Sequence, residues 1–409
     1  MPVTRCAHPV ARGQALAASV GLVLALVACG SNGSASTTTA ASGIPAGDIK
    51  LGGILTLSGT AAAFGQFEEA EFQTYADLVN DGGGVRGHKI TLDFENDQGD
   101  PTVAAQIATK MVSNHIDGII YPGLPESELQ TVPIFNKNKI PVITSDYAGM
   151  ADAAKYPYLF ATYPKPAAQM QALVDGAKAR GWSKIAIIQD GTSEGLGLSG
   201  PFSSEAKAAG LTITANVIYP ATAVDVSTQV AQARSSGADT VAVFATGGYA
   251  QVWTAMRSSN WHPHVLTTDI AKLVGYESMK EYAKTAVSTC VEPALTEGES
   301  PDADLAAAMK AVEAKLKAPP ITFLTAADLF LPVGAFKVAI DQANSVDATA
   351  LKKVMERWTK QTVVSPLNPL TYSATSHNGR GVEQVKLCGM ARQGEFGLNI
   401  ALPVHGQGS

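Results

Sequence analysis

The motif that most suggests covalent chemistry is Gly191-Thr192-Ser193-Glu194-Gly195. It has the GxSxG spacing of a hydrolase nucleophile elbow and follows an apolar segment, as such an elbow must. Ser193 would then be the nucleophile, with an acid and a histidine further along, and His377 is available for the last role. No HGGG-like oxyanion segment precedes the motif. A secreted α/β-hydrolase is therefore the alternative function, and we predict no catalytic residue and no enzyme activity.

Other polar residues stand where apolar segments end, and these suit binding rather than bond making. Short hydroxyls, glycines and single carboxylates approach a small polar ligand closely without filling the cavity around it. The same residue types also form helix N-caps and turns, which is the alternative explanation for each of them. The loops concerned contain Ser58-Gly59, Pro125-Glu126-Ser127, Ser145-Asp146-Tyr147, Thr192-Ser193-Glu194, Thr246-Gly247 and Asp269.

Metal and cofactor motifs are weak. The sequence has no CxxC or HExxH, and the His262-Pro263-His264 triplet has no further ligands nearby, so we predict no metal site. The stretch from Gly195 to Gly200 spells GxGxxG, but it does not directly follow a strand and no acid stands about 20 residues on. We therefore expect no bound cofactor.

Composition places the chain among soluble globular proteins of more than one lobe. It has 409 residues, of which 46% are hydrophobic and 16% charged, which is enough apolar material for two or three cores. The formal net charge is −6 and no run of Lys or Arg occurs. Nucleic acid is therefore an unexpected partner, because nothing would neutralise its phosphates.

The N-terminus resembles a secretory signal with a lipid attachment site. Arg5 and Arg12 precede an apolar run, Ala15 to Ala28, that is too short to span a bilayer. The run ends in Leu26-Val27-Ala28-Cys29-Gly30, which resembles the bacterial lipobox, in which the cysteine is lipidated and becomes the first residue. An ordinary signal peptide with a chance cysteine is the alternative. We expect a signal peptide over 1–28 and a flexible, lipid-anchored linker over 29–47, outside the cytoplasm at the cell membrane.

Two cysteines remain in the body, Cys290 and Cys388. An even pair in an oxidising compartment predicts a disulfide, with two buried free thiols as the alternative.

The elements that must position these residues alternate between strand and helix. Apolar strands are expected at Ile49 to Leu57, His88 to Phe94, Gly118 to Tyr121 and Pro141 to Thr144, with helices between them. Asp100-Pro101 predicts the start of one of these helices, since Asp caps the first turn and Pro is tolerated within it. Such alternation gives a parallel sheet with helices on both faces.

A second series starts after Tyr163-Pro164-Lys165-Pro166. Strands are expected at Lys184 to Gln189, Leu211 to Ile218, Thr240 to Ala245, Val265 to Thr268 and Ala286 to Val291, followed by three helical stretches and a last strand from Val382 to Met390. This predicts an α/β fold with two Rossmann-like, doubly wound parallel sheets, and ligands in such sheets lie at the carboxyl ends of the strands.

The chain resembles the leucine/isoleucine/valine-binding type of extracytoplasmic solute-binding protein. The resemblance is carried by Gly83 to Ile90, Glu95 to Pro101, Ala63-Phe64-Gly65, Lys184 to Asp190 and Ser365-Pro366-Leu367, in the family's order. It implies a type I periplasmic-binding fold with three hinge crossings, near Thr162 to Lys165, Val287 to Pro293 and Ser365 to Thr371. The lobes would comprise 48–163 with 292–366, and 164–291 with 367–409.

The same resemblance implies a function and a site. The function is capture of a small polar solute, an amino acid or similar, by a monomer that delivers it to an ABC permease. A ligand-sensing receptor of this fold is the alternative. Phe64 stands where an aromatic packs on the ligand, Ser127 and Ser145 where the ligand carboxylate is held, and Asp269 where an acid meets an ammonium. The remaining candidate ligand-binding residues are Glu126, Tyr147, Glu194, Thr246 and Gly247.

Overall fold

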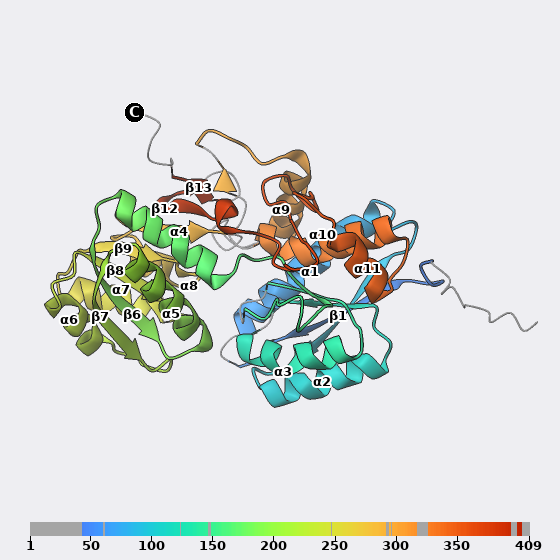
Figure 1. Ribbon diagram of the computed structural model, residues 1–409, viewed down its shortest axis with the longest axis horizontal. Helices are drawn as coiled ribbons and strands as arrows, with labels where there is room; N and C mark the ends of the chain where they lie inside the picture. Colours follow the sequence, from blue (N-terminus) through green and yellow to red (C-terminus); the bar gives the residue numbers. More distant parts are fainter. Residues whose placement is uncertain are drawn as a thin grey trace, which may run out of the picture. The chain divides into compact units, whose positions relative to one another are not determined.

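The computed structural model describes residues 43–59, 62–122, 124–145, 149–246, 248–291, 294–295, 297–316, 326–393 and 399–402. Cys29, Tyr147 and Gly247 lie outside these ranges. Two sheets are present, each with helices packed on both faces (Figure 1). The predicted α/β class, with two sheets in which parallel strands dominate, is confirmed.

The first sheet has five parallel strands in the order β2-β1-β3-β4-β5. They are β1 (Ile49–Leu55), β2 (Ile90–Asn96), β3 (Gly118–Tyr121), β4 (Val142–Thr144) and β5 (Leu159–Ala161). One face packs against α1 (Ala62–Asp81), α9 (Ala303–Leu316), α10 (Ala326–Ala343) and α11 (Ala348–Met355). The other face packs against α2 (Pro101–Ser113) and α3 (Pro125–Lys137).

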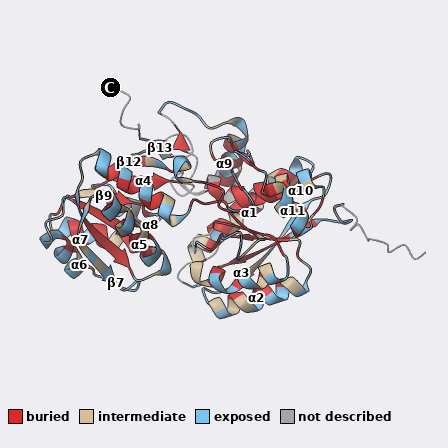
Figure 2. Ribbon diagram, in the orientation of Figure 1, coloured by how far each residue is buried: buried red, intermediate tan, exposed pale blue. Residues whose placement is uncertain are grey.

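The second sheet has eight strands in the order β11-β13-β12-β10-β9-β8-β6-β7. They are β6 (Lys184–Asp190), β7 (Thr212–Tyr219), β8 (Thr240–Phe244), β9 (His264–Thr267), β10 (Ala286–Cys290), β11 (Ala294–Leu295), β12 (Lys386–Gln393) and β13 (Asn399–Ala401). The helices are α4 (Pro166–Ala179), α5 (Ser193–Ala208), α6 (Ser227–Ser235), α7 (Tyr249–Ser258) and α8 (Ile270–Met279). Buried strand residues pack against apolar side chains of α4 and α5 on one side and of α6 and α7 on the other. Figure 2 colours the buried parts of these strands red.

The predicted strands agree with the structure to within a few residues, and the differences have local causes. The strand expected from Val382 begins with a short 3₁₀ turn, Val382–Gln384, and β12 starts only at Lys386. The sequence analysis did not identify β5, β11 and β13, which have two or three residues each. Strands this short carry too little alternation for a pattern to detect.

The third crossing between the sheets also differs from expectation. Leu370 and Tyr372 are buried in the first core, and Asn378 forms a bridge with Ala161 of β5. These residues therefore belong with the first sheet, although the sequence assigned 367–409 to the second lobe. The chain joins the second sheet at β12, which pairs antiparallel with β10. We propose a lobe boundary after Arg380.

The glycine-rich segment after α1 is a tight reversal that only small residues permit. Gly84 has φ +71°, and a Cβ there would lie 2.2 Å from the carbonyl oxygen of His88. Val85 and His88 form a bridge across the reversal, which returns the chain into β2. The helix start predicted at Asp100 is also confirmed, because its Oδ1 accepts a bond of 2.7 Å from the Thr102 N–H.

Two cysteines link strands of the second sheet. The sulfur atoms of Cys290 in β10 and Cys388 in β12 are bonded, and the Cα atoms lie 5.8 Å apart. Both residues are buried.

Helix α1 buries two carboxyl groups, Glu68 and Glu71. They are 2% and 0% exposed, and three of their four carboxyl oxygens have no hydrogen-bond partner among the described residues. Burial, and next the charge of Glu68, raise the pKa of Glu71 well above its usual range. Burial and the nearby Asp97 do the same to the pKa of Glu68. Both carboxyls therefore keep their protons to a higher pH in the folded protein than an exposed glutamate does.

This makes the stability of the protein fall as the pH rises. Because the folded-state pKa of Glu71 is raised, stability is greatest below the usual carboxyl pKa and is lost as the pH climbs toward the raised value. We expect Glu71→Gln, which cannot ionise, to increase the free energy of unfolding by about 1–3 kcal/mol at pH 8 and by little at pH 5. Urea unfolding at both pH values measures this. The control, Glu69→Gln on the same helix, should have no such pH dependence, and an equal effect of Glu71→Gln at both pH values would contradict the prediction.

Candidate functional site

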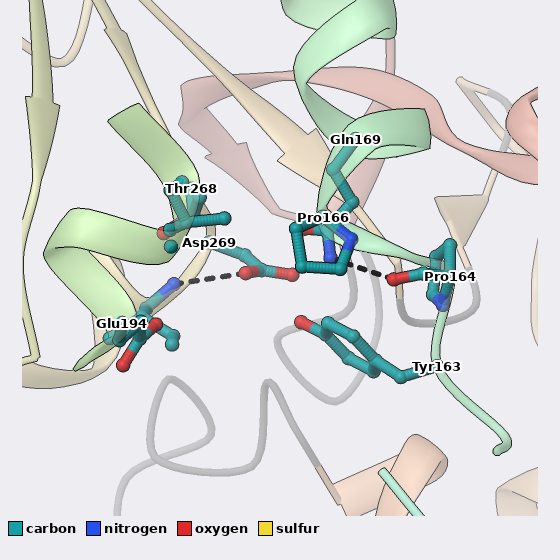
Figure 3. A pocket seen from close by; sticks show the side chains of 10 residues that line it. Tyr163, Pro164, Pro166, Gln169, Glu194, Thr268 and Asp269 are labelled. Atoms are coloured by element: carbon teal, nitrogen blue, oxygen red, sulfur yellow. Dashed lines mark hydrogen bonds between the residues drawn. The ribbon is translucent and has the colours of Figure 1, made fainter. Parts of the chain in front are cut away.

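A pocket lies at the carboxyl ends of strands in the second sheet, where the first crossing enters it (Figure 3). Its cavity volume is about 30 Å³, and the space rises to about 410 Å³ when the open solvent in front of it is included. It is lined by Tyr163, Pro164, Pro166, Gln169, Glu194, Gly197, Leu198, Thr268, Asp269 and Ile270. Its walls are thus the crossing itself, the first turns of α4 and α5, and the loop between β9 and α8.

Asp269 is held at this loop by the helix that follows it. It is the N-cap of α8, and its Oδ1 accepts a hydrogen bond of 3.0 Å from the Ile270 N–H. It is 2% exposed. The sequence therefore placed this carboxylate correctly at a strand end, and its capping role fixes its direction.

Glu194 is the second acid of the pocket and is half-buried in the first turn of α5. Its Oε2 accepts a hydrogen bond of 3.2 Å from the Thr246 hydroxyl. Burial is the main reason that the pKa of Glu194 rises to about 8, and the bond from Thr246 opposes the rise. The nearby carboxylates of Asp190, Asp269 and Glu126 raise this pKa further.

Asp190, at the end of β6, organises the loops around Glu194. It accepts a bond of 2.5 Å from the Thr192 hydroxyl and one of 2.8 Å from the Thr246 N–H. Gly195 makes this arrangement possible, because a Cβ there would lie 2.4 Å from the Asp190 carboxylate. Glu194 and Thr246 are thus fixed by a buried acid that the sequence analysis did not select.

On the first lobe, the hydroxyl expected to hold a ligand carboxylate is used internally. Ser127 is buried, and its Oγ donates to Oδ2 of Asp97 at 2.7 Å. Asp97 also accepts a hydrogen bond of 2.7 Å from the Thr56 hydroxyl. Ser145 is buried at the end of β4, and its N–H donates to the carbonyl of Tyr121 at 3.3 Å. Neither serine is among the residues that line the pocket.

Two pairs of acids connect the lobes electrostatically. Glu126, at the start of α3, raises the pKa of Glu194, although burial contributes more. Asp269 likewise adds to the rise in the pKa of Asp328 in α10, after burial as the main cause. Carboxylates of the first sheet's helices are therefore near enough to act electrostatically on the acids of this pocket.

The structure brings together part of the predicted set. Glu194 and Asp269 line the pocket, Thr246 bonds to Glu194, and Glu126 lies close enough to act on it. Phe64 is half-buried near the start of α1 and does not line the pocket. Tyr147 and Gly247 lie outside the described residues.

Eight of the ten lining residues were not among the predicted site residues, and three of them show why. The sequence identified Tyr163 and Pro164 only as parts of a crossing between the lobes. Their position in that crossing was the one feature that could have marked them as site residues. No sequence feature marked Gln169 as a site residue, because it is one of several polar residues in α4.

The arrangement required for the hydrolase alternative is absent from the described residues. Ser193 is exposed in the first turn of α5. The ring nitrogens of His377 contact the Leu159 carbonyl at 2.9 Å and Glu356 Oε1 at 3.2 Å, so neither pairs with Ser193. The GxGxxG stretch lies wholly inside α5. Within the described ranges, no three His, Cys, Asp or Glu side chains form a group that could hold a metal ion.

Two wound sheets, crossing segments between them and a polar pocket at strand ends define a two-lobe binding protein. Residues 48–391 match the family described as periplasmic binding protein, and the chain belongs to that family.

Curated relatives are similar over part of their length. The chain is 28% identical over 212 residues to "Leu/Ile/Val-binding protein homolog 8" of Brucella abortus, covering 47% of this chain and 51% of the relative. It is 26% identical over 205 residues to "Leu/Ile/Val-binding protein BraC3" of Rhizobium johnstonii, covering 49% of this chain and 55% of the relative. The chain thus spans about half the length of the curated relatives it matches.

Solved structures share the fold over most of the chain. A periplasmic binding protein type 1 from Bordetella pertussis Tohama I has a TM-score of 0.73 at 21% identity, covering 87% of this chain and 100% of its own. An ABC-transporter solute-binding protein from Rhodopseudomonas palustris, in complex with 4-hydroxybenzoate, has a TM-score of 0.71 at 17% identity. The match covers 87% of this chain and 96% of that protein.

Proposed function

We propose that this protein is an extracytoplasmic solute-binding lipoprotein that captures a small polar solute and delivers it to an ABC importer in the membrane. The observation that carries the proposal is the pocket at the strand ends, where the buried Asp269 and the half-buried Glu194 face a small cavity beside the crossing. Family membership supports the binding role, since the matched relatives are solute-binding proteins. The ligand we propose is an amino acid or a similarly small polar solute, which single carboxylates can pair at close range.

The proposed binding mechanism depends on the segments that cross between the two lobes. We propose that the lobes open and close about them, and that the ligand favours the closed state because only that state lets both lobes contact it. No bond is made or broken, and no cofactor takes part. A ligand-sensing receptor would bind in the same way, and loss of solute uptake on deletion of the gene would distinguish transport from sensing.

The anchor is proposed from the lipobox-like segment alone. Among the described residues, no helix is both long and apolar enough to cross a bilayer. We expect Cys29 to carry lipid, so that the native protein sediments with membranes and Cys29→Ser releases it. A mature N-terminus other than a modified Cys29, determined by mass spectrometry, would contradict this.

A ligand screen tests the binding function. Thermal unfolding is measured with amino acids, amides and small organic acids, because a ligand at 100 times its Kd stabilises the folded state by about 2.7 kcal/mol. Small-angle scattering with the same solute should show closure. Scattering profiles that stay the same under every stabilising solute would overturn the proposed mechanism.

The site is tested on the solute that the screen identifies. We expect Asp269→Ala to weaken its binding about 100-fold, because a ligand donor would lose its buried carboxylate. Phe64→Ala should weaken binding about tenfold if the aromatic packs on the ligand as the family resemblance implies. The control, Asp175→Asn on the exposed side of α4, should leave the Kd unchanged. Isothermal titration measures all three, and unchanged affinity in both site variants would show that the site lies elsewhere.

A further inference from the structure

One amide oxygen of the pocket receives no hydrogen bond from the described residues. Gln169 lines it and is 4% exposed. Its Nε2 donates to the Pro164 carbonyl at 3.0 Å, a contact that fixes which amide atom is the nitrogen (Figure 3). Its Oε1 has no hydrogen-bond partner in the described part of the chain. An amide oxygen that lines a pocket and receives no hydrogen bond there can accept one from a ligand N–H.

The lining is also one-sided in charge. It contains Glu194 and Asp269, and none of the ten described lining residues is Lys, Arg or His. Two buried cations stand outside this lining. Arg380 is bound to Asp328, and Lys272, three residues after Asp269 in α8, has an interaction of its own.

The facing lobe adds further negative charge. Glu126 acts on Glu194, and Asp328 and Asp269 act on each other. In an empty cleft the neighbouring carboxylates disfavour ionisation of Glu194, so this acid can carry its charge only when a cation joins it. A cation between them would replace repulsion by attraction and so link binding to closure.

From these contacts we propose that the solute carries a second, donor-rich cationic group, of the guanidinium or amidinium class, seated between Glu194 and Gln169, in addition to the group that meets Asp269. This rests on the proposed solute-binding function and specifies the class of solute. A planar guanidinium has five N–H donors and no acceptor, which matches a carboxylate and an amide oxygen on neighbouring helices. Glu194 is then the residue that selects basic solutes over leucine-like ones.

A carboxylate on the solute is not required by this arrangement. The Ser127 hydroxyl, expected to hold such a group, already donates to Asp97. A guanidino compound without a carboxylate should therefore bind nearly as well as one with it.

Binding should also release a proton. The pKa of Glu194 in the empty site is about 8, raised mainly by burial, with Asp190, Asp269 and Glu126 adding to it. Near pH 7 the carboxyl is mostly protonated, and pairing with a guanidinium requires it to ionise. The proton passes to the buffer, so the apparent binding enthalpy should depend on the ionisation enthalpy of the buffer.

The experiment is isothermal titration of the mature protein at pH 7 with arginine, agmatine, citrulline and leucine, in two buffers of different ionisation enthalpy. Citrulline matches arginine in shape but lacks the charge, and agmatine lacks the carboxylate. We expect arginine to bind about 100-fold more tightly than citrulline or leucine, agmatine to bind within about tenfold of arginine, and close to one proton to be released.

Single substitutions distinguish the role of Glu194 from general effects of mutation on binding. Glu194→Gln should weaken arginine binding about 100-fold and abolish the proton release, and Gln169→Leu should weaken arginine binding while retaining the release. The control, Glu205→Gln at the other end of α5, should change neither.

Equal affinity for arginine and citrulline, or proton release that survives Glu194→Gln, would overturn the assignment. If leucine or another uncharged solute binds tightly and closes the lobes, this inference is wrong and the proposed function stands. If no solute of any class binds or causes closure, both are wrong.

Discussion

Arg380→Ala is expected to lower the free energy of unfolding by about 3–5 kcal/mol, because it would leave a buried carboxylate without its counter-ion. The guanidinium of Arg380 donates to Asp328 Oδ2 at 2.8 Å. It also donates to the carbonyl of Thr162 at 2.7 Å and to that of Val291. Arg380 is 4% exposed, so none of these acceptors can turn to bulk water when the side chain is removed.

The position of these partners explains why the effect should be large. Thr162 precedes the first crossing, Val291 follows β10 at the second, and Asp328 lies in α10 of the first lobe. One side chain thus joins three segments that are far apart in the sequence. Even with Arg380 present, burial keeps the pKa of Asp328 raised.

Urea unfolding at pH 7 measures the prediction. The matched control is Arg86→Ala, because Arg86 pairs with Asp341 at 3.2 Å with both side chains about half exposed. Its loss should cost less than about 1 kcal/mol. The double variant Arg380→Ala/Asp328→Ala should recover part of the stability by removing the unpaired charge. A loss in Arg380→Ala no larger than in Arg86→Ala would contradict this account.

Loss of the disulfide is expected to have the next largest effect. Cys290 and Cys388 are 98 residues apart in the sequence and join β10 to β12. The loop that they close contains α9, α10 and α11, so an unfolded chain without the bond gains considerable freedom. We expect Cys290→Ala/Cys388→Ala to lower the free energy of unfolding by about 2–4 kcal/mol.

Reductant provides the internal control. Alanine is chosen because both positions are buried and apolar, so no new polar group is placed in the core. Unfolding of the wild type with dithiothreitol should approach that of the double variant, while the variant itself should not respond to reductant. Two free thiols in the untreated, denatured protein would instead establish that the cysteines are unpaired.

Local sequence patterns were sufficient to predict those features that a single segment of the chain determines by itself. The alternation of apolar strands with helices fixed the class of fold, and Asp100 could be recognised as a cap because its partner is two residues away. Asp269 and Glu194 could be placed at strand ends because parallel strands bring their carboxyl ends to one edge. Cys290 and Cys388 were the only cysteines left after the N-terminal segment, so their pairing could be expected from arithmetic.

Only the tertiary structure could decide what these side chains contact. Ser127 donates to a carboxylate 30 residues away, and Arg380 bonds to a carbonyl 218 residues away. The chain from Leu370 to Asn378 packs with the first sheet, although nothing in its own sequence ties it there. Hydrogen bonds and burial at such separations depend on how the sheets and crossings assemble. A one-dimensional pattern contains the residues of the site, but not which of them face one another.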